Sequence, residues 1–344
     1  MRKLTSLCAC LLVAPCAAPQ QLQYARLGDF RLESGGVVRD CRIGFRTFGT
    51  LNHERSNAIL FPTWFEGRTD QLEPVLRQLR LENYYVIAVD ALGNGVSSSP
   101  SSSSLQPKMA FPKFSVRDMV ESQHDLLVHY LGVSHLKAVM GISMGGLQAF
   151  QWMVSYPDFM DDAIPMFAAP RLAPYSLLYF KLGMDLITAD SAWKGGDYDT
   201  PPAQVTSTEL AGLLSFTPGY FDVHTSRDQL FWQVAESVAA RDRSDANDRI
   251  RQTQAVLQFD ISARFGGSMA AAASSVHARS LIIVSKSDHE ITPGPALEFA
   301  ELMHARTVVL DDDCGHNALL CEPETVAEAV HELLGAAVDR ERQP

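Results

Sequence analysis

Short β-branched runs alternate with stretches of helical spacing along most of the chain, and this alternation limits the fold more than any other feature. The runs, each typical of a strand buried on both faces, lie at 58–61, 85–89, 137–140, 163–167, 281–284 and 307–310. Stretches of helical spacing, such as 116–131 and 144–156, lie between most of them. This order predicts an α/β fold with a doubly wound, mostly parallel sheet. Residues 26–48 alternate polar and apolar side chains around a Gly35-Gly36 turn, which predicts an antiparallel start to the sheet.

The alternation stops between residues 169 and 278. This interval is rich in aromatic residues and methionine, lacks a convincing buried strand, and has helical runs at 173–189 and 230–258. Such an insertion in a regular sheet predicts a helical cap over the carboxyl ends of the strands, where α/β folds bind ligands. We therefore expect one catalytic domain, made of 19–168 and 279–344, with a cap at 169–278.

A glycine-rich motif follows directly after the predicted strand at 137–140. Residues 141–146 read Gly-Ile-Ser-Met-Gly-Gly, and a helix is predicted to begin near Met144. A serine on so sharp a turn adopts a strained backbone, and glycine is needed on both sides because a side chain there would clash with neighbouring backbone. The free N–H groups at the start of the helix would favour a developing oxyanion. We therefore predict that Ser143 is a catalytic nucleophile.

A serine hydroxyl is a good nucleophile at neutral pH only when a histidine removes its proton and a carboxylate orients that histidine. In a fold of this kind the acid and then the histidine follow the serine, each just past a later strand. Asp288 and His316 stand at these two places. An alternative acid is one of the aspartates Asp311, Asp312 and Asp313, and the neighbouring His289 is expected at the rim of the site.

An oxyanion hole needs two hydrogen-bond donors. The first expected donor is the backbone N–H of Met144, the residue after the nucleophile. The second should come from the loop after the strand at 58–61, and we expect it to be the backbone N–H of Phe65, with that of Trp64 as the alternative. Both aromatic side chains are also expected to line the pocket.

The N-terminus has the pattern of a secretory signal peptide. Residues 1–18 combine a short basic start, an apolar stretch too short to span a bilayer, and small residues where a signal peptidase could cut. We expect this segment to be removed and the protein to be secreted or periplasmic. No other segment reaches about 18 uninterrupted apolar residues, so no membrane partner is expected.

The cysteines outside that segment are Cys41, Cys314 and Cys321. An odd number excludes complete internal pairing. In an oxidising compartment, Cys314 and Cys321 are the most local pair and would close the loop that contains His316. The alternative is three buried, reduced thiols that behave as small hydrophobic side chains.

Composition and motifs argue against several other functions. A formal net charge of −11 and 46% hydrophobic residues are unlike a nucleic-acid-binding or disordered chain. His331-Glu332 starts like a zinc-protease helix, but Gly335 stands where the second histidine would be, so no metal site is predicted. Neither a phosphate-binding loop nor a dinucleotide fingerprint follows a predicted strand, so no cofactor is expected. The serine-rich tract 97–104 is predicted to be a solvated loop.

Beyond the N-terminal segment, nearly all of the chain resembles the homoserine O-acetyltransferase branch of the α/β-hydrolase superfamily. The segments that carry the resemblance are 42–52, 141–148 with Tyr156-Pro-Asp158, Trp193-Lys-Gly-Gly-Asp-Tyr198, Ser287-Asp288 and Gly315-His316. The Gly-Gly-Asp-Tyr stretch is the most specific, because it belongs to the cap entrance of that branch. Members carry an acetyl group from acetyl-coenzyme A to an amino-acid hydroxyl through an acyl-serine. The resemblance implies Ser143 as nucleophile, Asp288 as acid and His316 as base.

One departure from that branch bears on the substrate. In the transferases, the stretch soon after the Gly-Gly-Asp-Tyr motif supplies an arginine that binds the amino-acid carboxylate. The corresponding residues 209–217 here contain no arginine or lysine. Arg227 is the nearest downstream cation, in surroundings typical of an exposed turn. We therefore expect a pocket without a cation, in which binding a carboxylate would be costly.

The leading hypothesis is a serine esterase or related acyl hydrolase that acts on a small ester and needs no cofactor. Export supports it, because acetyl-coenzyme A is scarce outside the cytoplasm. The alternatives are an O-acyltransferase that uses acetyl-coenzyme A and a hydroxylated acceptor, and a hydrolase-fold protein that only binds. The expected partner is a small-molecule ester or acyl donor, without nucleic acid or membrane, and a homodimer through the cap stays open.

Overall fold

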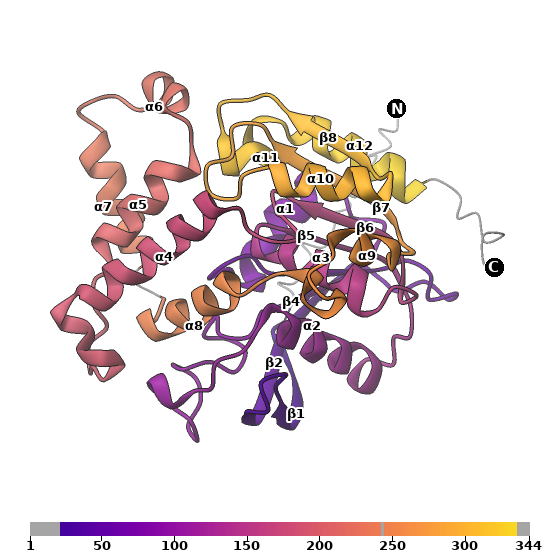
Figure 1. Ribbon diagram of the computed structural model, residues 1–344, viewed down its shortest axis with the longest axis horizontal. Coiled ribbons are helices and arrows are strands. Elements are labelled where there is room, and N and C mark those ends of the chain that lie inside the picture. The colour runs from indigo at the N-terminus through magenta and orange to yellow at the C-terminus, as the bar shows by residue number, and fades with distance from the viewer. Residues whose placement is uncertain (1–20, 242–243, 336–344) are drawn as a thin grey trace, which may run out of the picture.

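The protein is described here by a computed structural model that covers residues 21–241 and 244–335, so the expected signal peptide lies outside the described residues. An eight-stranded sheet has the order β1-β2-β4-β3-β5-β6-β7-β8 (Figure 1). The strands are β1 (Gln23–Arg31), β2 (Val37–Phe48), β3 (Ala58–Pro62), β4 (Tyr85–Val89), β5 (Leu136–Ile142), β6 (Met160–Met166), β7 (Arg279–Ser285) and β8 (Arg306–Leu310). The β1–β2 and β2–β4 pairs are antiparallel and the others are parallel, which confirms the predicted sheet.

Helices cover both faces of the sheet, so the central strands are apolar on both sides. On one face, Ile59 and Phe61 of β3 pack with residues of α1 (Leu72–Gln78) and α12 (Pro323–Gly335). On the other face, Leu60 belongs to a core cluster that includes residues of α2 (Val116–Asp125), α3 (Met144–Ser155) and α10 (Gly294–Met303). Each buried side chain of this size contributes about 1.5–3 kcal/mol to folding.

Two sequence expectations about burial are wrong. β8 is an edge strand that is not buried on both faces, because Thr307 is exposed and Val309 is 46% exposed. The serine tract is not simply a solvated loop, because its first residues are buried. Ser97 Oγ donates to the Asp90 carbonyl oxygen (2.6 Å), and the backbone N–H of Ser101 donates to Asp248 Oδ1 (2.8 Å).

Between β6 and β7 the described chain is helical. The helices are α4 (Pro174–Ala189), α5 (Val205–Ser215), α6 (Pro218–His224), α7 (Leu230–Arg241), α8 (Ala246–Leu257) and α9 (Met269–Ser274), with short 3₁₀ turns η4 (Ser191–Gly196) and η5 (Ile261–Phe265). In Figure 1, α4 to α7 project to one side of the sheet, whereas α9 packs against α10. The division into a catalytic domain and a cap at 169–278 stays a prediction. None of the described helices is long and apolar enough to cross a membrane.

Hydrogen bonds connect the Gly-Gly-Asp-Tyr segment, residues 195–198, to the start of α8. Gly196 has φ 89°, and a Cβ there would lie 2.2 Å from the side chain of Met109, so only glycine fits. Asn247 of α8 donates from Nδ2 to the Gly196 carbonyl (2.9 Å) and from its backbone N–H to Tyr198 Oη (3.1 Å), and it accepts from Trp193 Nε1 (2.9 Å). These bonds fix α8 relative to η4.

Candidate active site

Ser143 lies on the sharp turn between β5 and α3. Its φ of 56° is uncommon for a residue with a side chain. The glycines allow the turn, since a Cβ on Gly141 would lie 2.3 Å from the Gly145 carbonyl oxygen, and one on Gly145 2.5 Å from that of Pro62. The backbone N–H of Ser143 donates to the Met166 carbonyl of β6 (3.0 Å). These constraints hold a strained backbone conformation of the kind found at functional sites.

His316 joins Ser143 to Asp288. Its Nε2 lies 2.8 Å from Ser143 Oγ, and its Nδ1 lies 2.7 Å from Asp288 Oδ2. Oδ1 of Asp288 accepts the backbone N–H groups of Glu290 (2.8 Å) and Ile291 (2.9 Å), so the carboxylate has one fixed orientation. Asp288 is 2% exposed. The structure therefore brings together the three side chains that the sequence pattern pointed to.

The aspartates at 311–313 have other partners. Asp311 pairs with Lys286 (3.0 Å), Asp312 Oδ1 accepts the Cys314 N–H (2.6 Å), and the Asp313 carbonyl accepts from Thr217 Oγ1 (2.8 Å). Of the acids weighed from the sequence, Asp288 is the one that hydrogen-bonds to His316. His289 is half-buried, and the neighbouring residue that lines the cavity is Glu290.

Neighbouring charges alter the protonation of His316. Burial lowers the pKa of the ring, but the carboxylates of Asp288 and Glu290 outweigh it and raise the pKa to about 9. Glu290 Oε2 lies 3.9 Å from His316 Nε2. At neutral pH the ring is therefore mostly protonated, and its capacity to accept a proton grows as the pH rises toward 9.

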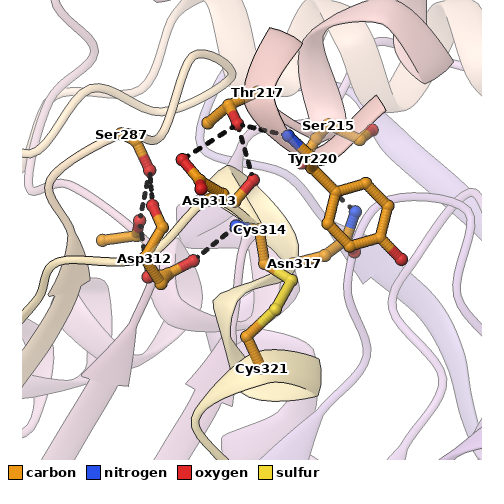
Figure 2. The surroundings of a disulfide bond; sticks show 10 residues. Ser215, Thr217, Tyr220, Ser287, Asp312, Asp313, Cys314, Asn317 and Cys321 are labelled. Carbon is orange, nitrogen blue, oxygen red and sulfur yellow. Dashed lines mark hydrogen bonds between the residues drawn. A yellow bond between two sulfur atoms is a disulfide. The ribbon is translucent and has the colours of Figure 1, made fainter. Parts of the chain in front are cut away.

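The loop that carries His316 is closed by a disulfide between Cys314 and Cys321 (Figure 2). Of the two arrangements left open by the sequence, the structure has this bond, and Cys41 is a free, buried thiol. Burial raises the pKa of Cys41 to about 12. Asp312 and the two bonded cysteines have ligand atoms within 4.8 Å of one another. Sulfurs bonded to each other are not thiolates, so this group has no thiolate ligands to offer a metal.

Hydrogen bonds attach α5 and α6 to the same loop (Figure 2). Thr217, at the start of α6, donates from Oγ1 to the Asp313 carbonyl (2.8 Å). Asn317 donates from Nδ2 to the carbonyl of Ser215, the last residue of α5 (3.3 Å). A movement of α5 and α6 would therefore reach the loop that positions His316.

Backbone N–H groups are available near Ser143 for an oxyanion. Met144 is the first residue of α3, so its N–H has no partner within the helix. After β3, the N–H of Thr63 donates to a carbonyl of β4 and that of Glu66 to a side chain of α8. Within the described residues the N–H groups of Trp64 and Phe65 make no hydrogen bond, and both residues line the cavity. Both therefore stay candidates for the second donor.

Gln148 of α3 holds these two backbone segments together, a role that the sequence did not reveal. Its Nε2 donates to the carbonyls of Thr63 (3.1 Å) and Met144 (3.0 Å). Its Oε1 accepts from Gln123 Nε2 (2.6 Å), and the side chain is fully buried. The motif 141–148 contains Gln148, but nothing in its local pattern indicated these contacts.

Gln252 of α8 fixes the loop after β3 from the other side. Its Oε1 accepts the Glu66 N–H (2.8 Å), and its Nε2 donates to the Leu92 carbonyl (3.0 Å). Glu66 and Gln252 are 186 positions apart, so no sequence signal could have linked them.

A cavity of about 760 Å³ lies beside Ser143 and His316. Its walls come from the loop after β3, from α4, from α5 and from α8, and they include Trp64, Phe65, Tyr179, Phe180, Ser207 and Arg249. The lining combines aromatic rings with a few polar groups, as is usual for small-molecule sites.

The expectation of a pocket without a cation is wrong. Arg249 of α8 lines the cavity and is 5% exposed, whereas Arg227 is exposed as predicted. Arg249 Nη1 donates to Ser207 Oγ (3.1 Å), and its Nε lies 3.5 Å from Glu66 Oε2. The guanidinium comes from a helix beyond the stretch 209–217, and the Glu66 carboxylate offsets part of its charge.

Comparison with known proteins gives the family. The family model for the alpha/beta hydrolase fold matches residues 59–323. The chain belongs to this family. Among its α/β-hydrolase relatives, an ethyl acetate hydrolase of Pseudomonas veronii is 29% identical over 286 residues, which are 78% of this chain and 81% of that protein. A homoserine O-acetyltransferase of Methanosphaerula palustris is 31% identical over 341 residues, which are 85% of this chain and 68% of that protein.

A solved α/β-hydrolase structure agrees. The crystal structure of an acetylester hydrolase from Corynebacterium glutamicum has a TM-score of 0.85 and 25% identity, and it covers 92% of this chain and 96% of its own. The relatives of this α/β-hydrolase thus include both esterases and homoserine O-acetyltransferases, which confirms the resemblance drawn from the motifs.

Proposed function

We propose that this α/β-hydrolase is a serine acyl hydrolase that cleaves small esters through an acyl-Ser143 intermediate. The observation that supports this most is the hydrogen-bonded chain from Ser143 through His316 to Asp288 beside a cavity of about 760 Å³. The names of the related ethyl acetate hydrolase and acetylester hydrolase favour a short acyl group.

In the acylation step, Ser143 Oγ attacks the ester carbonyl carbon while His316 Nε2 accepts the hydroxyl proton. Asp288 keeps the other ring nitrogen protonated and stabilises the imidazolium that forms. The N–H groups of Met144 and Phe65, or of Trp64 in place of Phe65, donate to the oxyanion. The imidazolium then protonates the alcohol oxygen as the ester bond breaks, which leaves the acyl group on Ser143.

In the second step, water replaces the alcohol. His316 accepts a proton from water, whose oxygen attacks the acyl carbon, and the imidazolium then returns the proton to Ser143 Oγ as the acid leaves. Hydrolysis of nitrophenyl esters of increasing chain length tests this proposal. We expect turnover of the acetate ester, falling with longer acyl chains. Absence of turnover with every chain length would contradict the proposal.

An O-acyltransferase is the second candidate, because a homoserine O-acetyltransferase is among the relatives and Arg249 brings a cation to the cavity wall. In that reaction a hydroxylated acceptor replaces water, and acetyl-coenzyme A is the acyl donor. A paired assay with and without acetyl-coenzyme A and a hydroxylated amino acid separates the two. Transfer in excess of hydrolysis would favour the transferase. A protein that only binds would leave Ser143 unlabelled by a fluorophosphonate.

We also propose that residues 1–18 direct export to an oxidising compartment. The Cys314–Cys321 disulfide supports this, because disulfides persist mainly in such compartments. Expression of the full chain and mass measurement of the product test it: the expected product lacks the first residues. A full-length product that stays in the cytoplasm would contradict the proposal.

A homodimer through the cap is a further proposal. Large apolar side chains are exposed on cap helices, namely those of Leu213, Val223, Phe231 and Trp232. Light scattering of the purified protein should give twice the chain mass, and Trp232→Glu should shift it toward the monomer. A wild-type protein with the mass of one chain at all concentrations would contradict the proposal.

A further inference from the structure

Glu290 lies on the loop between β7 and α10, two residues after Asp288. Its Oε2 is 3.9 Å from His316 Nε2, the same nitrogen that lies 2.8 Å from Ser143 Oγ. Its other carboxylate oxygen accepts a hydrogen bond from Ser215 Oγ at the end of α5. The Glu290 side chain is only 12% exposed. The His316 ring thus has a carboxylate near each of its two nitrogens.

We propose that Glu290 is a positioning residue of the reaction, a second carboxylate that stabilises the protonated ring of His316 while the acyl-serine forms. This inference rests on the proposed function of the Ser143 site. When His316 takes the proton from Ser143, the ring becomes a cation in a region shielded from water, and a nearby negative charge lowers the energy of that state.

The two carboxylates act on His316 in different ways. Asp288 hydrogen-bonds to Nδ1 at 2.7 Å and fixes the ring orientation. At 3.9 Å from Nε2, Glu290 is beyond hydrogen-bond distance and acts through its charge. The Nε2 nitrogen therefore remains available to Ser143 and to the leaving oxygen. The hydrogen bond from Ser215 makes the Glu290 position depend on the cap helix α5.

Other charged groups around His316 are not among those that raise its pKa. Its own loop carries the aspartates at 311–313, which have the partners given above, and α5, which packs against this loop, carries the exposed Glu209. The neighbour of Glu290 on its loop is His289, and α11 (Ala318–Cys321) presents the bonded Cys321. The charged groups on the cavity wall besides Glu290 are Glu66, Arg68, Asp70 and Arg249. The two carboxylates that raise the pKa of His316 are Asp288 and Glu290, in that order.

The experiment measures the rate at which an alkyl fluorophosphonate labels Ser143 between pH 6 and pH 10.5. The labelling rate follows the fraction of neutral His316 and needs no ester substrate, so it does not depend on ester specificity. The variants are Glu290→Gln and, as a matched control, Glu298→Gln on the exposed side of α10. For Glu290→Gln we expect the midpoint of the profile to fall by roughly one pH unit or more, with a lower rate at the plateau. Glu298→Gln should follow the wild type.

A merely structural role gives a different result. If Glu290→Gln lowered the rate equally at every pH and left the midpoint in place, the proposal would be overturned. If that variant does not fold, Glu290→Asp is used, which keeps the negative charge but places it one methylene farther from His316. The midpoint of its profile should fall by a smaller amount. An unchanged midpoint in this variant would also overturn the proposal. A wild-type protein that is not labelled at any pH contradicts the proposed function itself, whereas a labelled wild type with an insensitive midpoint contradicts only the inference about Glu290.

Discussion

The Nε2 nitrogen of His316 lies 2.8 Å from the Oγ of Ser143, although the two residues are 173 positions apart in the sequence. Ser143 follows β5 and His316 follows β8, and these strands belong to the parallel part of one sheet. The carboxyl ends of parallel strands meet at one edge, so the strand order brings the two side chains together. Any change in the loops at this edge should act on the same contact.

Asp288→Asn should lower kcat by about 10³–10⁴-fold with little loss of stability, because the amide no longer holds the histidine in the tautomer that accepts a proton. Steady-state kinetics with a nitrophenyl ester, together with thermal unfolding, measures both effects. The control is Asp311→Asn, which removes an exposed ion pair with Lys286 and should leave kcat unchanged. An equal loss of activity in the two variants would contradict the assignment of Asp288.

The activity should rise with pH toward the alkaline range. The pKa of His316 is raised to about 9, and only the neutral ring accepts the serine proton, so kcat/KM should increase up to about pH 9 and then level off. The raised pKa also stabilises the fold fully below about pH 6.5, the usual histidine value, and this contribution is lost as the pH passes 9. A profile of kcat/KM that is already level from pH 6.5 upward would contradict this prediction.

Gln148→Ala should lower both kcat and stability. The change frees the carbonyls of Thr63 and Met144 and leaves the buried amide of Gln123 without this partner, at a cost of about 1–3 kcal/mol. Denaturant unfolding and ester kinetics measure the two effects. The control is Gln151→Ala on the same helix, whose amide bonds to Ser155 and which should keep its kcat. A Gln148 variant with full kcat would show that the hydrogen bonds of Gln148 do not position the oxyanion donors.

Features that depend on local pattern could be predicted from the sequence. The apolar runs gave the strands because a strand with helices on both sides must be apolar on both faces, and the Ser143 turn could be predicted because glycine alone fits beside it. The position of Asp288 after β7 followed from the same strand pattern. The prediction that β8 is buried on both faces is wrong, because an apolar run does not show which strand lies at the edge of the sheet.

Contacts between distant segments could not be predicted. Arg249 and Gln252 stand in a stretch of helical spacing, where polar residues normally face solvent, yet α8 turns both toward the loop after β3. Glu290 could not be predicted, because it belongs to no recognisable catalytic motif. Its relation to His316 exists only once β7 and β8 lie side by side.

Loss of the disulfide should loosen the loop that holds His316. The double variant Cys314→Ser, Cys321→Ser should lower the free energy of unfolding by about 2 kcal/mol, since the bond closes a short loop. It should also reduce kcat more than KM, because His316 lies between the two cysteines. Cys41→Ala removes a sulfur without removing a cross-link and should keep kcat. A double variant with wild-type kcat would mean that the other contacts of the loop are enough to position His316.

In the proposed reaction an acyl group is bound covalently to Ser143, and intact-mass measurement tests this most directly. The purified protein is mixed with a short-chain nitrophenyl ester, quenched in acid within the first turnovers, and its mass is measured beside that of Ser143→Ala. We predict a fraction of wild-type chains heavier by one acyl group, with the added mass on the peptide that contains Ser143, and an unmodified and inactive Ser143→Ala variant. Ester turnover that persists in Ser143→Ala, or an acyl group on another residue, would contradict the account.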